Sequence, residues 1–182
     1  MGLKGVAVPS FIVVILVFIL MEPLTYLAHR YVMHGVGWTL HASHHRPRET
    51  RVELNDLFPV MFAAITIVML ALGTSISSLR VLVPIGIGVT LYGAVYSFVH
   101  DVYIHGRFFQ VGVIRPLEVL KRAHILHHLF DGEPYGMLMP IVPKRIRLQA
   151  KTLFGEDGEL RNGQDLLKTG DFSSGRKYIE VK

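Results

Sequence analysis

The sequence His41-Ala-Ser-His-His45 returns at residues 124–128 as His124-Ile-Leu-His-His128. In each copy the histidines stand at positions i, i+3 and i+4, a spacing that places three side chains on one face of an α-helix. Each copy follows a pair of histidines that are five residues apart, His29 with His34 and His100 with His105. All 10 histidines of the chain therefore lie in two matching blocks, each of which contains a five-residue pair followed by a triplet.

This clustering favours metal ligation. A single histidine on an apolar helix is usually a packed residue, but ten in two blocks of a chain without cysteine are difficult to explain as packing. Neutral imidazoles that crowd together gain most by sharing a cation. Because ten rings exceed the coordination number of one ion, we predict two metal ions, held by His29, His34, His41, His44, His45, His100, His105, His124, His127 and His128. Imidazole suits zinc, copper, iron and nickel alike, so these ligands do not name the metal.

The two five-residue pairs leave a geometric question open. Five residues advance a regular α-helix by about 500°, which leaves two such rings about 140° apart. Either a local π-type widening brings the rings together, or each pair straddles the metal site from a helix end.

The rest of the sequence predicts an all-α integral membrane bundle of three to four membrane helices with a cytoplasmic histidine-rich cap. The chain is 51% hydrophobic, with a mean hydropathy of +0.40. Apolar residues collect in runs at 6–27, 57–72 and 81–99, each long enough, or nearly so, to cross a hydrocarbon core about 30 Å thick. We place a membrane-embedded domain at 1–148 and a hydrophilic C-terminal tail, rich in glycine and charge, at 149–182.

Three crossings would put both histidine blocks on one side of the membrane, and of the 19 lysines and arginines only Lys4 and Arg80 would lie opposite. The positive-inside rule then makes the histidine side cytoplasmic. We expect an uncleaved anchor in a bacterial inner membrane, since no arginine-rich transit peptide is evident and cleavage would discard residues beside the histidines. A transporter would carry its ligands near the bilayer midplane. Ligands clustered at helix ends on one face instead predict an enzyme with a lipid-dissolved substrate.

Three polar residues beside the histidines are candidates for fixing ligand tautomers. Asp101 adjoins His100, and Asn55 and Asp56 follow the first block, where their oxygens could accept the second ring N–H of a ligand. In the alternative, Asp56 is an N-cap for the apolar run that follows, and Asp101 is a solvated charge at a helix end.

Two further features adjoin the apolar runs. Glu22 lies inside the first run, about two helical turns before His29, and is either functional or an interfacial residue beside a Pro23 kink. Gly132 and Gly136 mark a turn that we expect to fold residues 137–142 back against the membrane surface.

Several motifs accompany the histidines in order: His41-Ala-Ser-His-His-Arg-Pro-Arg-Glu49, Glu53-Leu-Asn-Asp56, Phe98-Val-His-Asp101 and Pro134-Tyr-Gly136. Together they resemble the non-haem carotene 3-hydroxylases, a branch of the fatty acid hydroxylase and sterol desaturase superfamily, over about residues 20–143. The histidine pattern alone is typical of the superfamily, and the added motifs favour the carotene branch.

The resemblance implies two iron ions held by these histidines and hydroxylation of carbon 3 of a β-ionone ring, which converts β-carotene to β-cryptoxanthin or zeaxanthin with O2 and two electrons. Chemistry agrees, because an unactivated C–H bond offers side chains neither an acidic proton nor an electrophilic carbon, so redox metal and O2 are needed. Zinc could replace iron in a preparation.

Expected partners are a carotenoid, membrane lipid, and a ferredoxin or similar electron donor with its reductase, but no nucleic acid. The basic residues Arg145, Arg147 and Lys151 could steer such a donor or attract anionic lipid.

One departure bears on the substrate. The chain has Val102-Tyr103 where the family typically has Gly-Leu, and ring preference would differ if this stretch lines the pocket. A fatty acid or sterol hydroxylase or desaturase is the alternative within the same chemistry. A non-catalytic membrane protein for metal storage or sensing is the alternative outside it.

Overall fold

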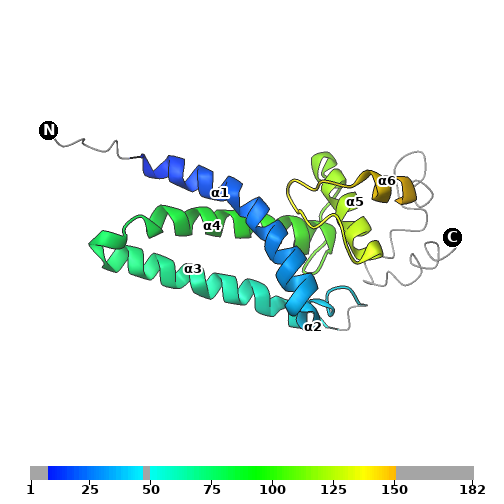
Figure 1. The fold of residues 1–182 in the computed structure, drawn as a ribbon, viewed down its shortest axis with the longest axis horizontal. Helices are drawn as coiled ribbons and strands as arrows, with labels where there is room; N and C mark the ends of the chain where they lie inside the picture. Colours follow the sequence, from blue (N-terminus) through cyan, green and yellow to red (C-terminus); the bar gives the residue numbers. More distant parts are fainter. Residues whose placement is uncertain (1–7, 47–49, 151–182) are drawn as a thin grey trace. The chain divides into compact units, whose positions relative to one another are not determined.

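The computed structural model describes residues 8–46 and 50–150, and all regular secondary structure in these ranges is helical (Figure 1). This confirms the predicted all-α class. The chain divides into two compact units, Met1–Met21 with Phe58–Val95 and Glu22–Leu57 with Tyr96–Lys182. The tail predicted at 149–182 lies outside the described residues apart from its first two, which end the last helix.

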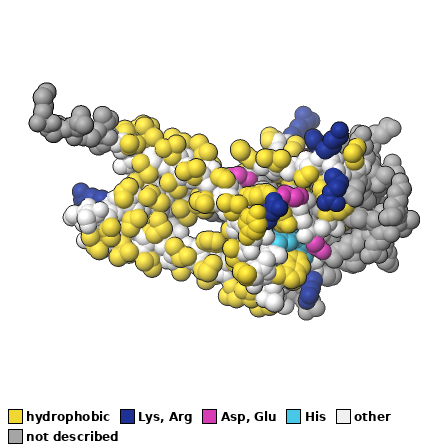
Figure 2. Space-filling view, in the orientation of Figure 1, with side chains coloured by type: hydrophobic (Ala, Val, Ile, Leu, Met, Phe, Trp, Pro, Cys, Tyr) yellow, Lys and Arg dark blue, Asp and Glu magenta, His cyan; other side chains and the backbone are white. Residues whose placement is uncertain are grey.

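Three long apolar helices dominate the sequence of elements: α1 (Ser10–Leu27), α3 (Leu57–Ser75) and α4 (Leu82–Ser97). With their flanking turns they form three segments long and apolar enough to cross a membrane, Ser10–Val36, Leu54–Ser75 and Leu82–Ile104. Most of their side chains are not buried inside the protein, and Figure 2 shows a surface rich in hydrophobic side chains. Such a surface is stable only in contact with lipid, so the chain is an integral membrane protein.

The first unit packs these helices through small residues. In Figure 1, α3 and α4 form a hairpin joined by the short turn η3 (Ser77–Leu79). A Cβ atom on Gly86 would lie 2.7 Å from Leu70, and one on Gly88 would lie 2.8 Å from Val17. Glycine at these two positions therefore permits the close approach of α4 to α3 and to α1.

The second unit holds the shorter elements. They are η1 (Ala28–Val36), α2 (Trp38–His41), η2 (Leu54–Asp56), η4 (Phe98–Ile104), α5 (Arg115–Phe130) and α6 (Lys144–Ala150). Its core joins Val99, Tyr103 and Ile104 of η4 to Ile125 and Leu129 of α5. All ten histidines belong to this unit, and nine of them are buried.

Candidate metal centre

Both five-residue histidine pairs lie on π-helical turns. His29 and His34 belong to η1, which continues α1, and His100 and His105 stand on η4 and its C-cap, which continue α4. The backbone N–H of His105 donates to the carbonyl of His100 at 3.0 Å, which is the i→i+5 bond of a π-turn. The rings of each pair accordingly lie 5.1 and 4.7 Å apart. Of the two arrangements that the sequence left open, the structure has the π-type widening.

The histidines converge in two groups, within each of which the ring nitrogens lie within 4.8 Å of one another. The first group is His29, His34, His41, His45 and His127, and the second group is His44, His100, His105 and His124. The Nε2 atom of His128 lies 2.9 Å from that of His124, so we count His128 with the second group. The ten predicted ligands thus divide into five and five.

The two groups do not each derive from one sequence block, because the middle histidine of each triplet crosses to the other group. His44 comes from the first block and joins the second group, whereas His127 comes from the second block and joins the first group. On a helix such as α5, position i+3 lies about 60° to one side of position i, and i+4 lies about 40° to the other side. In α5 the side chain of His127 therefore points about 100° away from that of His128 around the helix axis. The predicted helical face of the first triplet is not formed, because α2 ends at His41 and the chain continues in turns, in which the backbone N–H of His44 donates to the His41 carbonyl.

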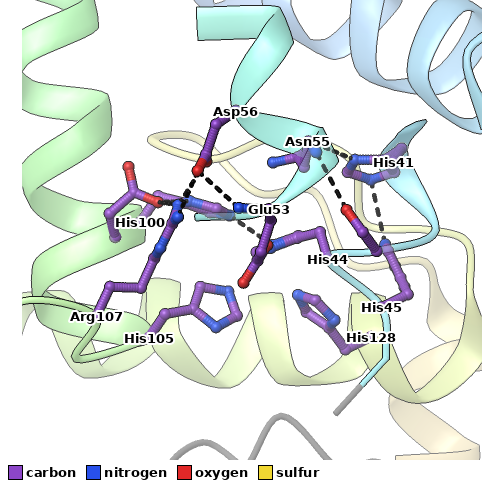
Figure 3. A network of polar contacts seen from close by, with 12 residues as sticks. His41, His44, His45, Glu53, Asn55, Asp56, His100, His105, Arg107 and His128 are labelled. Carbon is purple, nitrogen blue, oxygen red and sulfur yellow. Dashed lines mark hydrogen bonds and ion pairs between the residues drawn. The ribbon is translucent and has the colours of Figure 1, made fainter. Parts of the chain in front are cut away.

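Six rings donate their Nδ1–H group to an oxygen, which leaves the Nε2 lone pair to point into a group. The pairs are His29 with the Tyr135 carbonyl (3.0 Å), His41 with Asn55 Oδ1 (2.7 Å), His44 with Glu53 Oε2 (3.1 Å), His45 with Asp131 Oδ1 (2.9 Å), His100 with Asp101 Oδ1 (3.0 Å) and His127 with the Gly132 carbonyl (2.5 Å). The pairs of His41 with Asn55 and of His44 with Glu53 appear in Figure 3.

Contacts between Nε2 atoms then test whether the groups fit a metal. The Nε2 atom of His41 lies 3.1 Å from that of His29 and 3.2 Å from that of His45, and the His44 and His100 Nε2 atoms are 2.9 Å apart. Both rings of each contact carry their hydrogen on Nδ1, so two lone pairs face each other and need a cation between them. Two nitrogens about 2.1 Å from one ion are about 3.0 Å apart at a right angle and about 3.4 Å apart at a tetrahedral angle. The donor set therefore fits metal ions.

Burial keeps the ligand rings neutral, which is the form that binds metal. Loss of hydration, followed by the charge of neighbouring rings, lowers the pKa of His41 from 6.5 to about 2. The same causes lower the pKa of other rings well below 6.5: His44, His124, His127 and His128.

These lowered pKa values predict loss of metal and of stability in acid. Between the folded and unfolded pKa values the unfolded chain binds more protons, so stability is fully present above pH 6.5 and declines as the pH falls below it. We expect metal content and the thermal midpoint of the detergent-solubilised protein to fall together between about pH 7 and about pH 5. An unchanged midpoint and metal content across this range would contradict the account.

The three polar residues predicted beside the histidines take two kinds of position. Asn55 and Asp101 each accept a ring N–H, from His41 and His100 respectively. Asp56 accepts the backbone N–H of Glu53 in a capping box and both terminal nitrogens of Arg107. Their part in catalysis remains a prediction.

Sequence reasoning did not identify other partners of the rings. Glu53 begins the Glu53–Asp56 motif, nine residues after His44, but no pattern in the sequence pairs the two, and Asp131 is 86 residues from His45 along the chain. Asp131 adopts a left-handed conformation (φ 48°) directly after α5. Aspartate tolerates the left-handed conformation at a helix end better than most residues. An aspartate at the end of the second histidine block was therefore the one feature of the sequence that could have drawn attention to Asp131.

Glu22 holds the loop that follows the last histidines. Its buried carboxylate accepts the backbone N–H groups of Met137, Leu138 and Met139 at 2.9 to 3.1 Å. A Cβ atom on Gly136 would lie 3.0 Å from the Met139 carbonyl and 3.1 Å from Glu22 Oε1. The turn therefore folds this loop onto Glu22, within the second unit.

The Glu22 contacts predict a stability effect. A Glu22→Gln variant keeps the shape but loses the charge and one acceptor oxygen, which we expect to cost about 1–3 kcal/mol and several degrees of thermal midpoint. Gly136→Ala should lower the midpoint by a smaller amount, because its Cβ atom would lie 3.0 Å from the Met139 carbonyl, which is closer than an ordinary van der Waals contact. An exposed substitution on the same helix, Leu20→Ala, is the matched control, and a Glu22→Gln midpoint equal to that of the control would refute this role.

Tyr103, at the site of the Val102-Tyr103 departure, packs in the core of the second unit. Its hydroxyl accepts the backbone N–H of Ile114 at 3.0 Å and donates to Glu118. The side chain thus ties η4 to the start of α5.

Comparison with known proteins gives one family. The fatty acid hydroxylase family model matches residues 14–145, which include every histidine. The β-carotene hydroxylase of Pseudescherichia vulneris is 45% identical over 123 residues, covering 66% of this chain and 69% of that protein. The β-carotene hydroxylase of Pantoea ananas is 41% identical over 145 residues, covering 76% and 81%. The chloroplastic β-carotene 3-hydroxylase 1 of Arabidopsis thaliana is 41% identical over 122 residues, or 62% of this chain and 38% of that protein. No solved structure matches this chain.

Proposed function

The chain belongs to the fatty acid hydroxylase family, and from this we propose that it is a membrane enzyme that adds a hydroxyl group to the β-ionone ring of a carotenoid. The observation that carries the proposal is the 45% and 41% identity to two bacterial proteins named β-carotene hydroxylase, over more than two thirds of each. The resemblance in the Glu53–Asp56 and Pro134–Gly136 motifs supports the same substrate class.

We further propose that both histidine groups bind iron and that O2 is the co-substrate. Hydroxylation consumes O2, two electrons and two protons; one oxygen atom enters the C–H bond and the other leaves as water. Side chains cannot supply this oxidation, whereas bound iron supplies the activation of O2. The protein's own contribution is to hold the Nε2 atoms in place through the six Nδ1 hydrogen bonds and to exclude water by burying nine histidines.

The position of the groups supports a substrate dissolved in lipid. The π-turns that carry four of the ligands end the segments Ser10–Val36 and Leu82–Ile104, which can cross a membrane. A carotenoid lying in the bilayer could reach such helix ends without leaving the hydrocarbon. We propose a bacterial inner membrane with the histidines facing the cytoplasm, where a ferredoxin or similar donor with its reductase would supply electrons.

A fatty acid is the second candidate substrate, because the matching family model is that of fatty acid hydroxylases. It would be distinguished from a carotenoid by the products formed. A non-catalytic metal-binding protein would form no product at all.

The test is the pigment profile of bacteria that accumulate β-carotene, with and without this chain. We expect new carotenoids that carry one or two added oxygens, and none with a His127→Ala, His128→Ala double variant expressed at the same level. Well-expressed, iron-loaded protein that leaves β-carotene unchanged, when supplied with a ferredoxin and its reductase, would overturn the carotenoid assignment. Hydroxylated fatty acids in those cells would then favour the second candidate.

A further inference from the structure

The ring N–H groups of the first group donate mostly to neutral oxygens. Backbone carbonyls accept from two of its rings, and the amide oxygen of Asn55 accepts from a third, that of His41. A fourth ring, that of His45, donates to the carboxylate of Asp131, whose side chain is 33% exposed. Solvent partly screens this carboxylate, so the one charge that accepts a ring N–H from the first group acts at reduced strength.

The second group has two carboxylates in the same role. His44 donates to Glu53, whose side chain is 9% exposed, and His100 donates to Asp101, whose side chain is 18% exposed. A carboxylate that accepts the ring N–H of a ligand makes that ring more basic and so strengthens its bond to a cation. Because these carboxylates are less exposed than that of Asp131, solvent weakens their effect less.

One buried cation fixes the position of these acids. The guanidinium of Arg107, whose side chain is 5% exposed, donates to both oxygens of Asp56 at 2.8 and 2.7 Å (Figure 3). It also donates to Asp101 at 3.2 Å. Asp56 in turn accepts the backbone N–H of Glu53 at 2.9 Å. A planar guanidinium with a bidentate partner has a fixed orientation, which an ammonium group does not provide.

We propose that Arg107 is a positioning residue for the second group, and that with Glu53 and Asp101 it makes this group hold its metal ion more tightly than the first group holds its own. The inference rests on the proposed function in that both groups are taken to bind metal. Its physical basis is the charge near each ion. Beside the second group the carboxylates of Glu53, Asp101 and Asp56 outnumber the one cation, Arg107, whereas neutral oxygens and one partly exposed carboxylate surround the first group. The two ions should therefore leave at different rates, the ion of the first group leaving first.

The experiment follows the release of iron from the full-length, detergent-solubilised protein to an excess of chelator. For the wild type we expect two ions per chain and two phases of release. Asp101→Asn keeps the shape and the acceptor oxygen but removes the charge, and should accelerate the slow phase roughly 10- to 100-fold while leaving the fast phase unchanged. Asn55→Asp makes the opposite change, because it adds a charge at the acceptor of His41 in the first group, and it should slow the fast phase alone.

Substitutions of Arg107 test the positioning role directly. Arg107→Met removes a positive charge, which alone would slow release, but it also removes the contacts that orient Asp56 and Asp101, so the positioning role predicts a faster slow phase. Arg107→Lys, which keeps the charge without the bidentate contact, should also accelerate the slow phase. Mössbauer spectra of protein loaded with iron-57 give a second measurement, in which Asp101→Asn should alter one iron signal and leave the other unchanged.

The outcomes separate the inference from the proposed function. Two ions released at a single rate, or an Asp101→Asn variant in which both phases accelerate equally, would overturn the inference and leave the function standing. Fewer than two ions per wild-type chain would overturn the two-metal function itself, and the inference with it. Asp101→Asn and Asn55→Asp conserve side-chain shape, so they test the difference in metal retention between the two groups even if Arg107→Met does not fold.

Discussion

Replacing His127 by alanine is expected to remove the metal ion of the first group and to lower hydroxylase activity by more than about 100-fold, although His127 comes from the second sequence block. The reason is the crossing of the middle histidines, which gives His127 to the first group and His44 to the second. His44→Ala is the reciprocal variant and should empty the second group. Iron per chain, measured on purified protein, should fall from two ions to one in each single variant.

Double variants distinguish crossed groups from groups built by one block each. His41→Ala with His127→Ala changes two members of the first group, so we expect one ion to remain. His124→Ala with His127→Ala changes one member of each group, so we expect none to remain. The reverse result, with no ion in the former and one in the latter, would show that each block builds its own group.

Iron, but not zinc, is expected to restore activity to protein that has been stripped of metal. Removal of metal by chelator should abolish product formation, because no side chain can supply the oxidation. Zinc binds nitrogen ligands of this kind but has no redox chemistry, so zinc-loaded protein should have the thermal midpoint of a metal-bound chain and form no product. The measurement is product formed per chain after reloading with each metal.

Two results would contradict this prediction. Activity of the zinc-loaded protein equal to that of the iron-loaded protein would exclude a redox role for the metal. Full activity of the metal-free chain would exclude a role for the histidine groups in the reaction.

The membrane helices and the convergence of the histidines followed from patterns that are local in the sequence. Apolar runs predicted the membrane helices, and repeated spacing predicted that the histidines belong together. Asn55 and Asp101 could be predicted near the rings because each lies close in sequence to a histidine block.

The parts that could not be predicted depend on contacts between distant segments. The two five-residue histidine pairs lie on π-turns and not on α-turns because both rings of a pair must point toward the same site. The local sequence does not indicate the direction of that site. The crossing of His44 and His127 requires knowledge of how the two blocks face each other. Arg107 donates to Asp56 although the two residues are 51 positions apart in the sequence, so no local spacing predicted this ion pair.

The most direct test of the central claim is the origin of the oxygen atom in the product. Purified, iron-loaded protein would be given β-carotene, a reduced ferredoxin with its reductase, and isotopically heavy O2 in ordinary water. The account predicts that each new hydroxyl group carries one heavy oxygen atom, as mass spectrometry of the carotenoid would show. Hydroxyl groups that carry the oxygen of water would contradict it.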